Sequence, residues 1–233
     1  MEENNLAENN IIEEREKKFF EFLKERQIWV IGVLIVALIL GIYIRTLPMA
    51  DHGGHPGLWD ITTNTWTLGP DLDPWLFLRQ AKSIVEKGYL PKIDYMRNVP
   101  LGFDNSIEVP LLPRMIDWTY QIAKIFKIDA NVEYAGVIFP VIMFALTILF
   151  FFLFVREIFI KKDKESIIKA NIIALISTFL MIVSPAFLSR TVAGIPEKES
   201  AGFFFLFLAF YLFLKAWKSK KLMVSVILAV LSG

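Results

Sequence analysis

The sequence contains no cysteine, only two histidines, and a net charge of +1 across 233 residues. Without cysteine the chain has no disulfide and no thiolate metal site, so a bound metal would need oxygen or imidazole ligands. Oxygen ligands favour a hard divalent cation. The near balance of charge gives no bulk indication of nucleic-acid binding, and nucleic acid is not an expected partner.

Apolar residues make up 55% of the sequence and gather in long uncharged runs instead of short periodic patches. A helix needs about 20 residues to span the hydrocarbon core of a bilayer, and four of the runs approach or exceed that length. We therefore predict an all-α polytopic membrane protein. The runs are Ile28 to Ile44, Tyr134 to Val155, Ala170 to Ser189 and Ser200 to Leu214.

A fifth apolar run begins at Leu222 and continues to the last residue, Gly233. At about 1.5 Å per residue this run is too short to cross a hydrocarbon core of about 30 Å. We therefore expect the chain to be a fragment of a longer protein, or one whose remainder is supplied elsewhere, with its fifth membrane helix starting here.

The predicted organisation follows the order of these runs. Apolar residues recur at helical spacing in Pro74 to Lys87 and in Leu111 to Lys127, which predicts two amphipathic helices in a long loop. The N-terminal segment mixes basic and apolar residues and favours a helix on the membrane surface. The predicted segments are 1–27 (cytoplasmic, amphipathic), 28–47 (first transmembrane helix), 48–132 (first external loop), 133–155 (second transmembrane helix), 156–169 (basic cytoplasmic loop), 170–189 (third transmembrane helix), 190–199 (second external loop), 200–217 (fourth transmembrane helix), 218–221 (basic cytoplasmic loop) and 222–233 (start of a fifth helix).

The short basic loops predict the orientation of the chain. The N-terminal flank and the loops 156–169 and 215–221 are all rich in Lys and Arg, and successive crossings place all three on one side. The positive-inside rule makes that side the cytoplasm. The protein is therefore expected in the plasma membrane as a multi-pass protein with a cytoplasmic N-terminus.

Two acidic pairs fall in the two loops that this topology places on the external face. Asp71 and Asp73 precede the first amphipathic helix, and Glu197 and Glu199 precede the fourth membrane run. Carboxylates are the ligands that hard divalent ions prefer. Their shared placement favours a metal site on the external face, because an ionisable group at a membrane boundary is costly unless it is used.

Each pair also has a simpler interpretation. Asp73 followed by Pro74 is a common helix start, with Asp as the N-cap and Pro at the first helical position. Glu197 and Glu199 flank Lys198, and charged residues in loops are often no more than solvated surface.

The motifs around these pairs resemble the N-terminal part of the catalytic subunit of oligosaccharyltransferase, especially in its archaeal forms. The resemblance covers about residues 28 to 233, including the segment from Ala81 to Pro113, and the order of membrane spans agrees. It implies a GT-C type membrane fold that transfers a glycan from a lipid-linked donor to Asn in Asn-X-Ser/Thr, with Mn²⁺ or Mg²⁺. The motifs are GPDLDPWLFLR from Gly69 to Arg79 and SRTVAGIPEKES from Ser189 to Ser200.

The resemblance also implies roles for individual residues. Asp73 matches the acid that binds metal and faces the acceptor amide, and is therefore the expected catalytic residue. Glu197 and Glu199 match the acid-x-acid motif that supplies further metal ligands, although Asp is common where this sequence has Glu197. Arg79 and Asp71 are weaker candidates for substrate binding. The later acid and the acceptor-reading domain of the family lie beyond this chain, so the chain alone is expected to be inactive.

Two alternatives from other classes remain open at this stage. Another GT-C transferase that uses a lipid phosphosugar, such as a protein O-mannosyltransferase, could share the acid of the first loop; the second acidic pair argues against it. A transporter or assembly subunit would be expected to carry ionisable residues within its spans, where this sequence has almost none.

The predicted topology can be tested by labelling single cysteines in this cysteine-free chain. A cysteine at Lys162 should react only with reagent on the cytoplasmic side, and one at Asn105 only with reagent outside, because the basic loops set the orientation. Impermeant maleimide added to intact and to inverted vesicles measures this. Labelling of both positions from one side would contradict the orientation.

Overall fold

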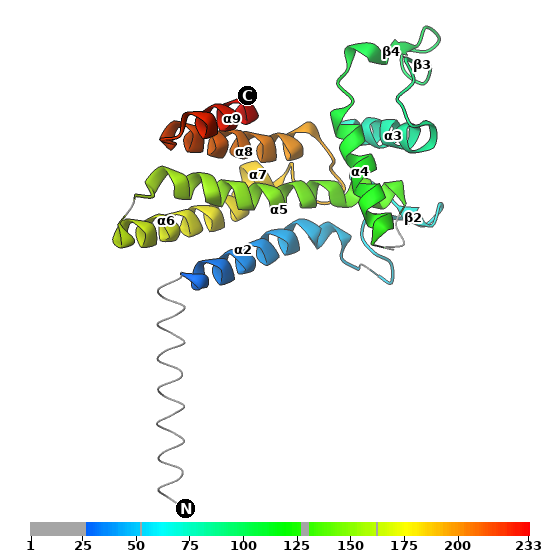
Figure 1. The fold of residues 1–233 in the computed structure, drawn as a ribbon. Helices are drawn as coiled ribbons and strands as arrows, with labels where there is room; N and C mark the ends of the chain where they lie inside the picture. Colours follow the sequence, from blue (N-terminus) through cyan, green and yellow to red (C-terminus); the bar gives the residue numbers. More distant parts are fainter. Residues whose placement is uncertain (1–26, 52, 127–130, 162) are drawn as a thin grey trace, which may run out of the picture.

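The computed structural model describes residues 27–51, 53–126, 131–161 and 163–233, so the predicted surface helix of the N-terminal segment lies outside the described residues. Within these described ranges, four helices are long and apolar enough to cross a membrane, and they lie side by side (Figure 1). This confirms the predicted all-α polytopic fold. They are α2 (Ile28–Thr46), α5 (Val132–Phe159), α6 (Lys164–Val183) and α8 (Lys198–Lys218), and the shorter α9 (Leu222–Ser232) packs against α8.

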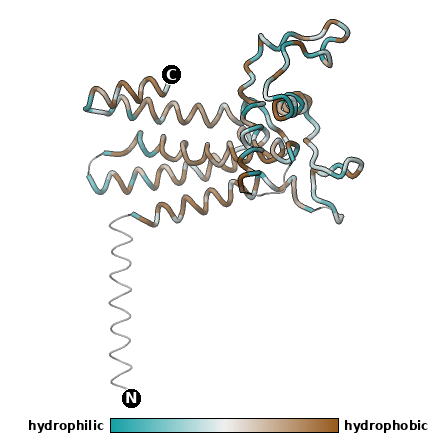
Figure 2. The backbone as a smooth tube through the Cα atoms, turned by 45° about the vertical axis from the view of Figure 1, so that its right-hand side comes forward, coloured by the Kyte–Doolittle hydropathy of each residue, from teal (hydrophilic) through white to brown (hydrophobic). Residues whose placement is uncertain are grey.

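Helix α5 is the centre of the bundle because α2, α6 and α8 all pack against it. Phe144 and Ile148 of α5 are fully buried and contact Ala37 of α2, Ile182 of α6 and Phe207 of α8. Figure 2 shows that hydrophobic residues continue along all of these helices. The uncharged runs therefore provide both the membrane-facing surface and the packing between helices.

The third apolar run is not one continuous helix. Helix α6 begins at Lys164, ahead of the expected start, because the side chain of Asp163 caps it by accepting a hydrogen bond from the backbone N–H of Ser166 at 2.7 Å. It ends at Val183, and Pro185 starts the short helix α7 (Pro185–Leu188). A proline disfavours helical backbone in the residue before it, and Ser184 is accordingly extended.

The long first loop contains the two expected amphipathic helices and several short elements that the periodicity did not predict. Helices α3 (Leu72–Lys87) and α4 (Leu111–Ile125) pack against each other and against α5 (Figure 1). The other elements are the antiparallel pair β1 (Trp59–Asp60) and β2 (Thr65–Trp66), the antiparallel pair β3 (Ile93–Asp94) and β4 (Phe103–Asp104), and the 3-10 turns η1 (Leu47–Met49) and η2 (Asn105–Ile107).

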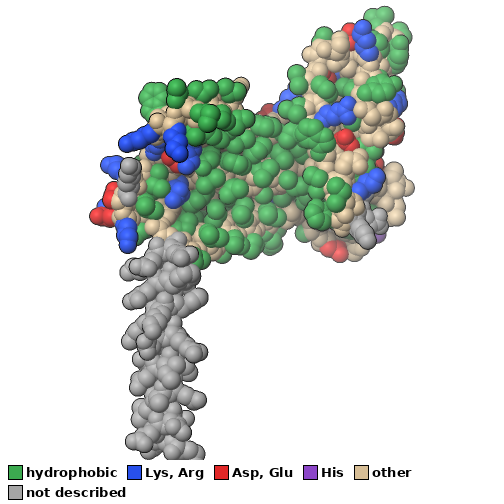
Figure 3. Space-filling model, viewed as in Figure 1, with side chains coloured by type: hydrophobic (Ala, Val, Ile, Leu, Met, Phe, Trp, Pro, Cys, Tyr) green, Lys and Arg blue, Asp and Glu red, His purple; other side chains and the backbone are tan. Residues whose placement is uncertain are grey.

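A compact apolar cluster holds this loop on the bundle. Phe77 and Ala81 of α3 and Ile116 of α4 are buried against Ala135 and Phe139, near the N-terminal end of α5. The loop therefore caps one end of the helices. Figure 3 shows a broad hydrophobic band along the bundle and a cluster of Lys and Arg side chains at its other end.

Helices α2 and α5 approach each other closely at Gly41. A Cβ atom there would lie 2.3 Å from Cδ1 of Ile148, whereas one at Gly32 of the same helix would meet no atom within 4 Å. We expect Gly41→Val to lower the free energy of unfolding by about 1 to 3 kcal/mol more than Gly32→Val, because Ile148 is fully buried. Denaturation in detergent micelles measures this, and equal effects of the two substitutions would contradict the packing.

Candidate functional site

The two loops that carry the acidic pairs meet at the capped end of the bundle. Three backbone hydrogen bonds hold the second loop: Ala193 N–H donates to Arg45 C=O at 2.9 Å, and Gly194 N–H donates to Val137 C=O at 2.9 Å. The third joins the loops directly, because Gly69 N–H donates to Gly194 C=O at 2.8 Å. The predicted proximity of the two loops is therefore present in the structure.

Gly194 adopts the left-handed conformation, with φ of +85°, that this arrangement requires. A Cβ atom at this position would lie 2.7 Å from Cδ1 of Leu58 and 3.2 Å from the backbone nitrogen of Gly69. Only glycine adopts this backbone conformation without strain and also leaves room for the first loop.

Arg45, near the C-terminal end of α2, contacts the second loop, and its role was not identified from the sequence. Its side chain is fully buried, donates from Nη1 to the C=O of Ile182 at 2.6 Å, and donates from Nε to Oγ1 of Thr191 at 3.2 Å. Its guanidinium carbon also lies 3.6 Å from the centre of the Phe144 ring. Because a buried charge is costly without partners, these contacts fix the ends of α2 and α6 relative to the loop.

The first loop enters α3 at Asp71, so the simpler interpretation of Asp73 as the N-cap is wrong. The helix begins at Leu72, and the carboxylate of Asp71 accepts a hydrogen bond from the backbone N–H of Leu72 at 2.8 Å. Asp73 lies in the first turn, and Pro74 follows it instead of starting the helix. A proline is tolerated anywhere in the first turn, where its missing N–H has no partner in the helix, so the start of α3 was misassigned.

Arg190 bridges the two loops and was also missed. Its Nη1 lies 2.5 Å from Oε2 of Glu197 and 3.4 Å from Oδ2 of Asp71. The sequence signal was a single arginine in a short external loop that also carries an acidic pair. The guanidinium joins one acid from each predicted pair, and Asp71 thereby has a larger part in the site than its weak match suggested.

The environment of Glu197 opposes its ionisation. Glu197 is the N-cap residue of α8, and its side chain is buried. Burial raises its pKa, the Arg190 contact lowers it, and the nearby carboxyls of Asp71 and Glu199 raise it again, so that the pKa lies above the usual glutamate value. Perturbed carboxyl groups in a cluster of this kind are typical of functional sites.

The other predicted residues have different surroundings. Asp73 and Glu199 are exposed, and no group of three or more Asp, Glu or His side chains within the described ranges is arranged to hold a metal ion. Arg79 pairs with Asp94 through two guanidinium nitrogens, Nη1 and Nη2, with Nη1 2.9 Å from Oδ1. This contact holds the pKa of Asp94 below its usual range. Arg79 thus braces the β3–β4 segment against α3.

The donor set fits a divalent cation in its chemistry alone. Asp71 and Glu197 are carboxylates from different loops that share one guanidinium, and burial is the main reason that the pKa of Glu197 is raised. Glu199 adds further negative charge. Hard cations such as Mg²⁺ and Mn²⁺ prefer such oxygen ligands.

Comparison with known proteins shows which family the chain resembles. The family described as "Oligosaccharyl transferase STT3, N-terminal" matches residues 62–233. Dolichyl-phosphooligosaccharide-protein glycotransferase 2 of Archaeoglobus fulgidus is 29% identical over 185 residues, which are 79% of this chain and 27% of that protein. The structure of archaeal oligosaccharyltransferase AglB from Archaeoglobus fulgidus, in complex with an inhibitory peptide and a dolichol-phosphate, is similar with a TM-score of 0.65 and 24% identity, over 89% of this chain and 24% of that chain.

These similarities define the class as a polytopic helical membrane protein with the GT-C type fold of glycosyltransferases. The chain belongs to the STT3 family of oligosaccharyl transferases and corresponds to the N-terminal region of that family. It spans about a quarter of the length of the relatives that it matches. The family resemblance found in the sequence is therefore confirmed, and it is a resemblance to enzymes instead of transporters.

The contact between Arg190 and Glu197 predicts a pH dependence of stability. A raised pKa means that the folded protein binds this proton more tightly than the unfolded chain, so stability falls as pH rises through that pKa. Arg190→Gln removes a compensating charge and should enlarge this loss. Relative to the wild type, the melting temperature of R190Q should therefore be lower at about pH 7 than at about pH 4, on either side of the usual glutamate pKa of about 4.3.

The double variant R190Q/E197Q is the control for this experiment. It has no carboxylate at Glu197 to ionise, so the extra pH dependence of R190Q should disappear. Thermal unfolding of the three proteins across the pH range measures this. A constant offset between R190Q and the wild type at every pH would contradict the electrostatic explanation.

Proposed function

We propose that the protein is the N-terminal part of an oligosaccharyltransferase catalytic subunit that carries out N-glycosylation. In this proposal it transfers an oligosaccharide from a polyprenyl or dolichyl phosphate donor to Asn of an Asn-X-Ser/Thr acceptor. The observation that carries the proposal is that acids from both loops converge on Arg190 in a member of the STT3 family. The structure of AglB in complex with an inhibitory peptide and a dolichol-phosphate supports both substrate classes.

The chemistry of the reaction suits these side chains. An amide nitrogen is a poor nucleophile, and the departing lipid phosphate is strongly anionic, so the site must stabilise negative charge at the leaving group. Asp73, Glu197 and Glu199 would hold Mn²⁺ or Mg²⁺, which when bound would neutralise the charge on the leaving group. Asp73 would also accept a hydrogen bond from the acceptor amide.

The surrounding residues would keep these groups in place. Arg190 holds the carboxylate of Glu197 near Asp71, and Asp71 caps the helix that carries Asp73. The N-terminus of α3 has a positive potential that favours a nearby phosphate. That potential opposes a bare cation, and we therefore propose that the metal and the anionic donor bind cooperatively.

The proposed location follows from the basic loops. The site would face the exterior of the plasma membrane, and the N-terminus and the Lys-rich end of the bundle would face the cytoplasm. This side is where a translocated lipid-linked donor would meet an acceptor polypeptide.

The separate roles of Asp73 and Asp71 can be tested in the complete enzyme. Asp73→Ala should lower glycopeptide formation by about 10² to 10³, by analogy with the loss of other groups that stabilise transition-state charge, while leaving thermal unfolding unchanged. Asp71→Ala should lower the free energy of unfolding by about 1 kcal/mol because it removes the cap. Transfer of glycan to a fluorescent Asn-X-Thr peptide, measured beside thermal unfolding, separates the two effects.

Metal titration adds a second measurement. Glu199→Gln should increase the Mn²⁺ concentration needed for half-maximal transfer, because it removes a proposed ligand from an exposed position. Glu86→Gln is a matched control, since Glu86 is an exposed acid on α3 outside the site. Full transfer by D73A with an unchanged metal requirement would leave Asp73 without the proposed role.

A further inference from the structure

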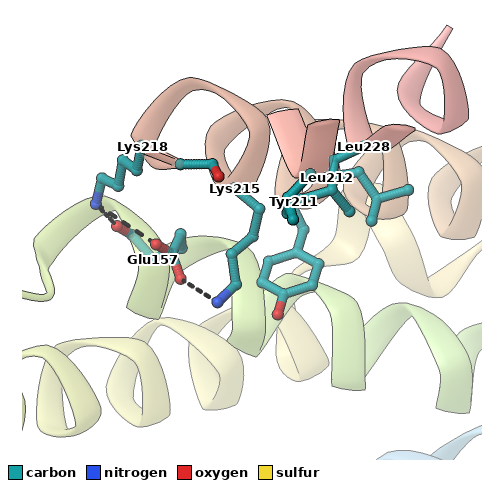
Figure 4. Close-up of a pocket in the computed structure, with 8 residues that line it drawn as sticks. Glu157, Tyr211, Leu212, Lys215, Lys218 and Leu228 are labelled. Carbon is teal, nitrogen blue, oxygen red and sulfur yellow. Dashed lines mark hydrogen bonds and ion pairs between the residues drawn. The ribbon is translucent and has the colours of Figure 1, made fainter. Parts of the chain in front are cut away.

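A polar cavity lies at the end of the bundle opposite the candidate site. Its volume is about 380 Å³, and it lies between the C-terminal end of α5 and the α8–α9 hairpin (Figure 4). The polar side is formed by Glu157 of α5 and by Lys215 and Lys218 of α8. This cavity shares no residue with the loops that carry Asp71 and Glu197, and the proposed function does not use it.

The positive charge in this cavity exceeds the negative charge. Glu157 is 9% exposed, and its carboxylate lies 3.6 Å from Nζ of Lys215 and 3.8 Å from Nζ of Lys218. The Lys218 ammonium also donates a hydrogen bond to the backbone C=O of Glu157. One carboxylate therefore faces two ammonium groups, which remain 44% and 37% exposed. One ion pair with Glu157 is enough to hold α5 to α8. The second lysine therefore adds a positive charge that the carboxylate does not neutralise and that an external anion can bind.

The other side of the cavity is apolar. Leu212 of α8 and Val224 and Leu228 of α9 line it, and Figure 4 shows Leu212 and Leu228 on the α8–α9 side, with the Tyr211 ring between them and Lys215. A ligand that fits must therefore combine an anionic head with a hydrocarbon chain.

We infer that this cavity binds one anionic phospholipid, with its phosphate between Lys215 and Lys218 and a hydrocarbon chain along α9. Basic pockets between helices at a membrane surface are suited to anionic headgroups, because each lysine near the surface adds to the attraction. Lys220 and Lys221 in the adjoining turn are exposed and do not line the cavity. Lys220 and Lys221 attract anionic lipid to the membrane surface in general, whereas Lys215 and Lys218 would hold one lipid headgroup in the cavity.

The test compares two pairs of lysines that carry the same charge. The protein is placed in nanodiscs of phosphatidylcholine with a small fraction of phosphatidylglycerol, and native mass spectrometry counts the phosphatidylglycerol retained after release into detergent. K215Q/K218Q should weaken retention of one phosphatidylglycerol by about thirty-fold, the effect expected for two surface lysines. K220Q/K221Q should change retention by less than about threefold, because these side chains do not reach the cavity.

Glu157→Gln tests the same cavity with a variant that should strengthen lipid binding instead of weakening it. It removes the carboxylate that competes with a phosphate for both ammonium groups, so retention of phosphatidylglycerol should become tighter while the lysines stay in place. This variant also decides the result if K215Q/K218Q fails to fold. Glycerol 3-phosphate, added as a soluble headgroup without a hydrocarbon chain, should not displace the lipid at equal concentration if the apolar wall contributes to binding.

Two outcomes would overturn the inference. Equal losses from both lysine pairs would show that general surface charge, and not the cavity, retains the lipid. Unchanged or weaker retention in E157Q would show that Glu157, Lys215 and Lys218 form a structural contact between α5 and α8 and no lipid site.

Discussion

The backbone hydrogen bonds of residues 190–197 are the constraint on which the candidate site depends. They tie one short segment to the end of α2 at Arg45, to α5 at Val137, and to the first loop at Gly69. Since α2 and α5 are positioned by buried residues along the bundle, the acids of the loop take their positions from the packing of the helices. The buried guanidinium of Arg45 extends the same constraint to α6. An exposed pair of loops thereby gains the rigidity that a catalytic site requires.

The sequence predicts the bundle well because membrane helices are specified by the mean hydropathy of a long run of residues. A run of about 20 apolar residues spans a bilayer almost regardless of its details, so α2, α5, α6 and α8 were all expected. The ends of the helices were less predictable, since single residues decide them. Asp163 extends α6 toward its N-terminus and Pro185 ends the run early, and neither effect alters the mean hydropathy of a long window.

The candidate site was predicted in part, for a related reason. The acidic pairs were visible as local motifs, and the alternation of membrane crossings placed them on one face. Arg190 and Arg45 were missed because their roles depend on contacts across more than a hundred positions of sequence, to Asp71 and Ile182 respectively. A single arginine in a loop has many uses, and no spacing rule distinguishes a residue that bridges two loops from one that is solvated. The short strands of the first loop were missed because two-residue pairs have no periodicity to detect.

Arg190 and the proposed cation would draw on the same carboxylate oxygens. A guanidinium at 2.5 Å from Glu197 compensates part of the negative charge, so the structure tolerates acids that would otherwise repel one another. A dication taking the same oxygens would weaken the Arg190 contact, because two positive groups close to one carboxylate repel each other. The released guanidinium would then suit a phosphate, which it can bind through two parallel hydrogen bonds. In the proposed mechanism Arg190 would pair with the acids until the cation takes its place and would then be available to the anionic donor, which is a physical route to the proposed cooperativity.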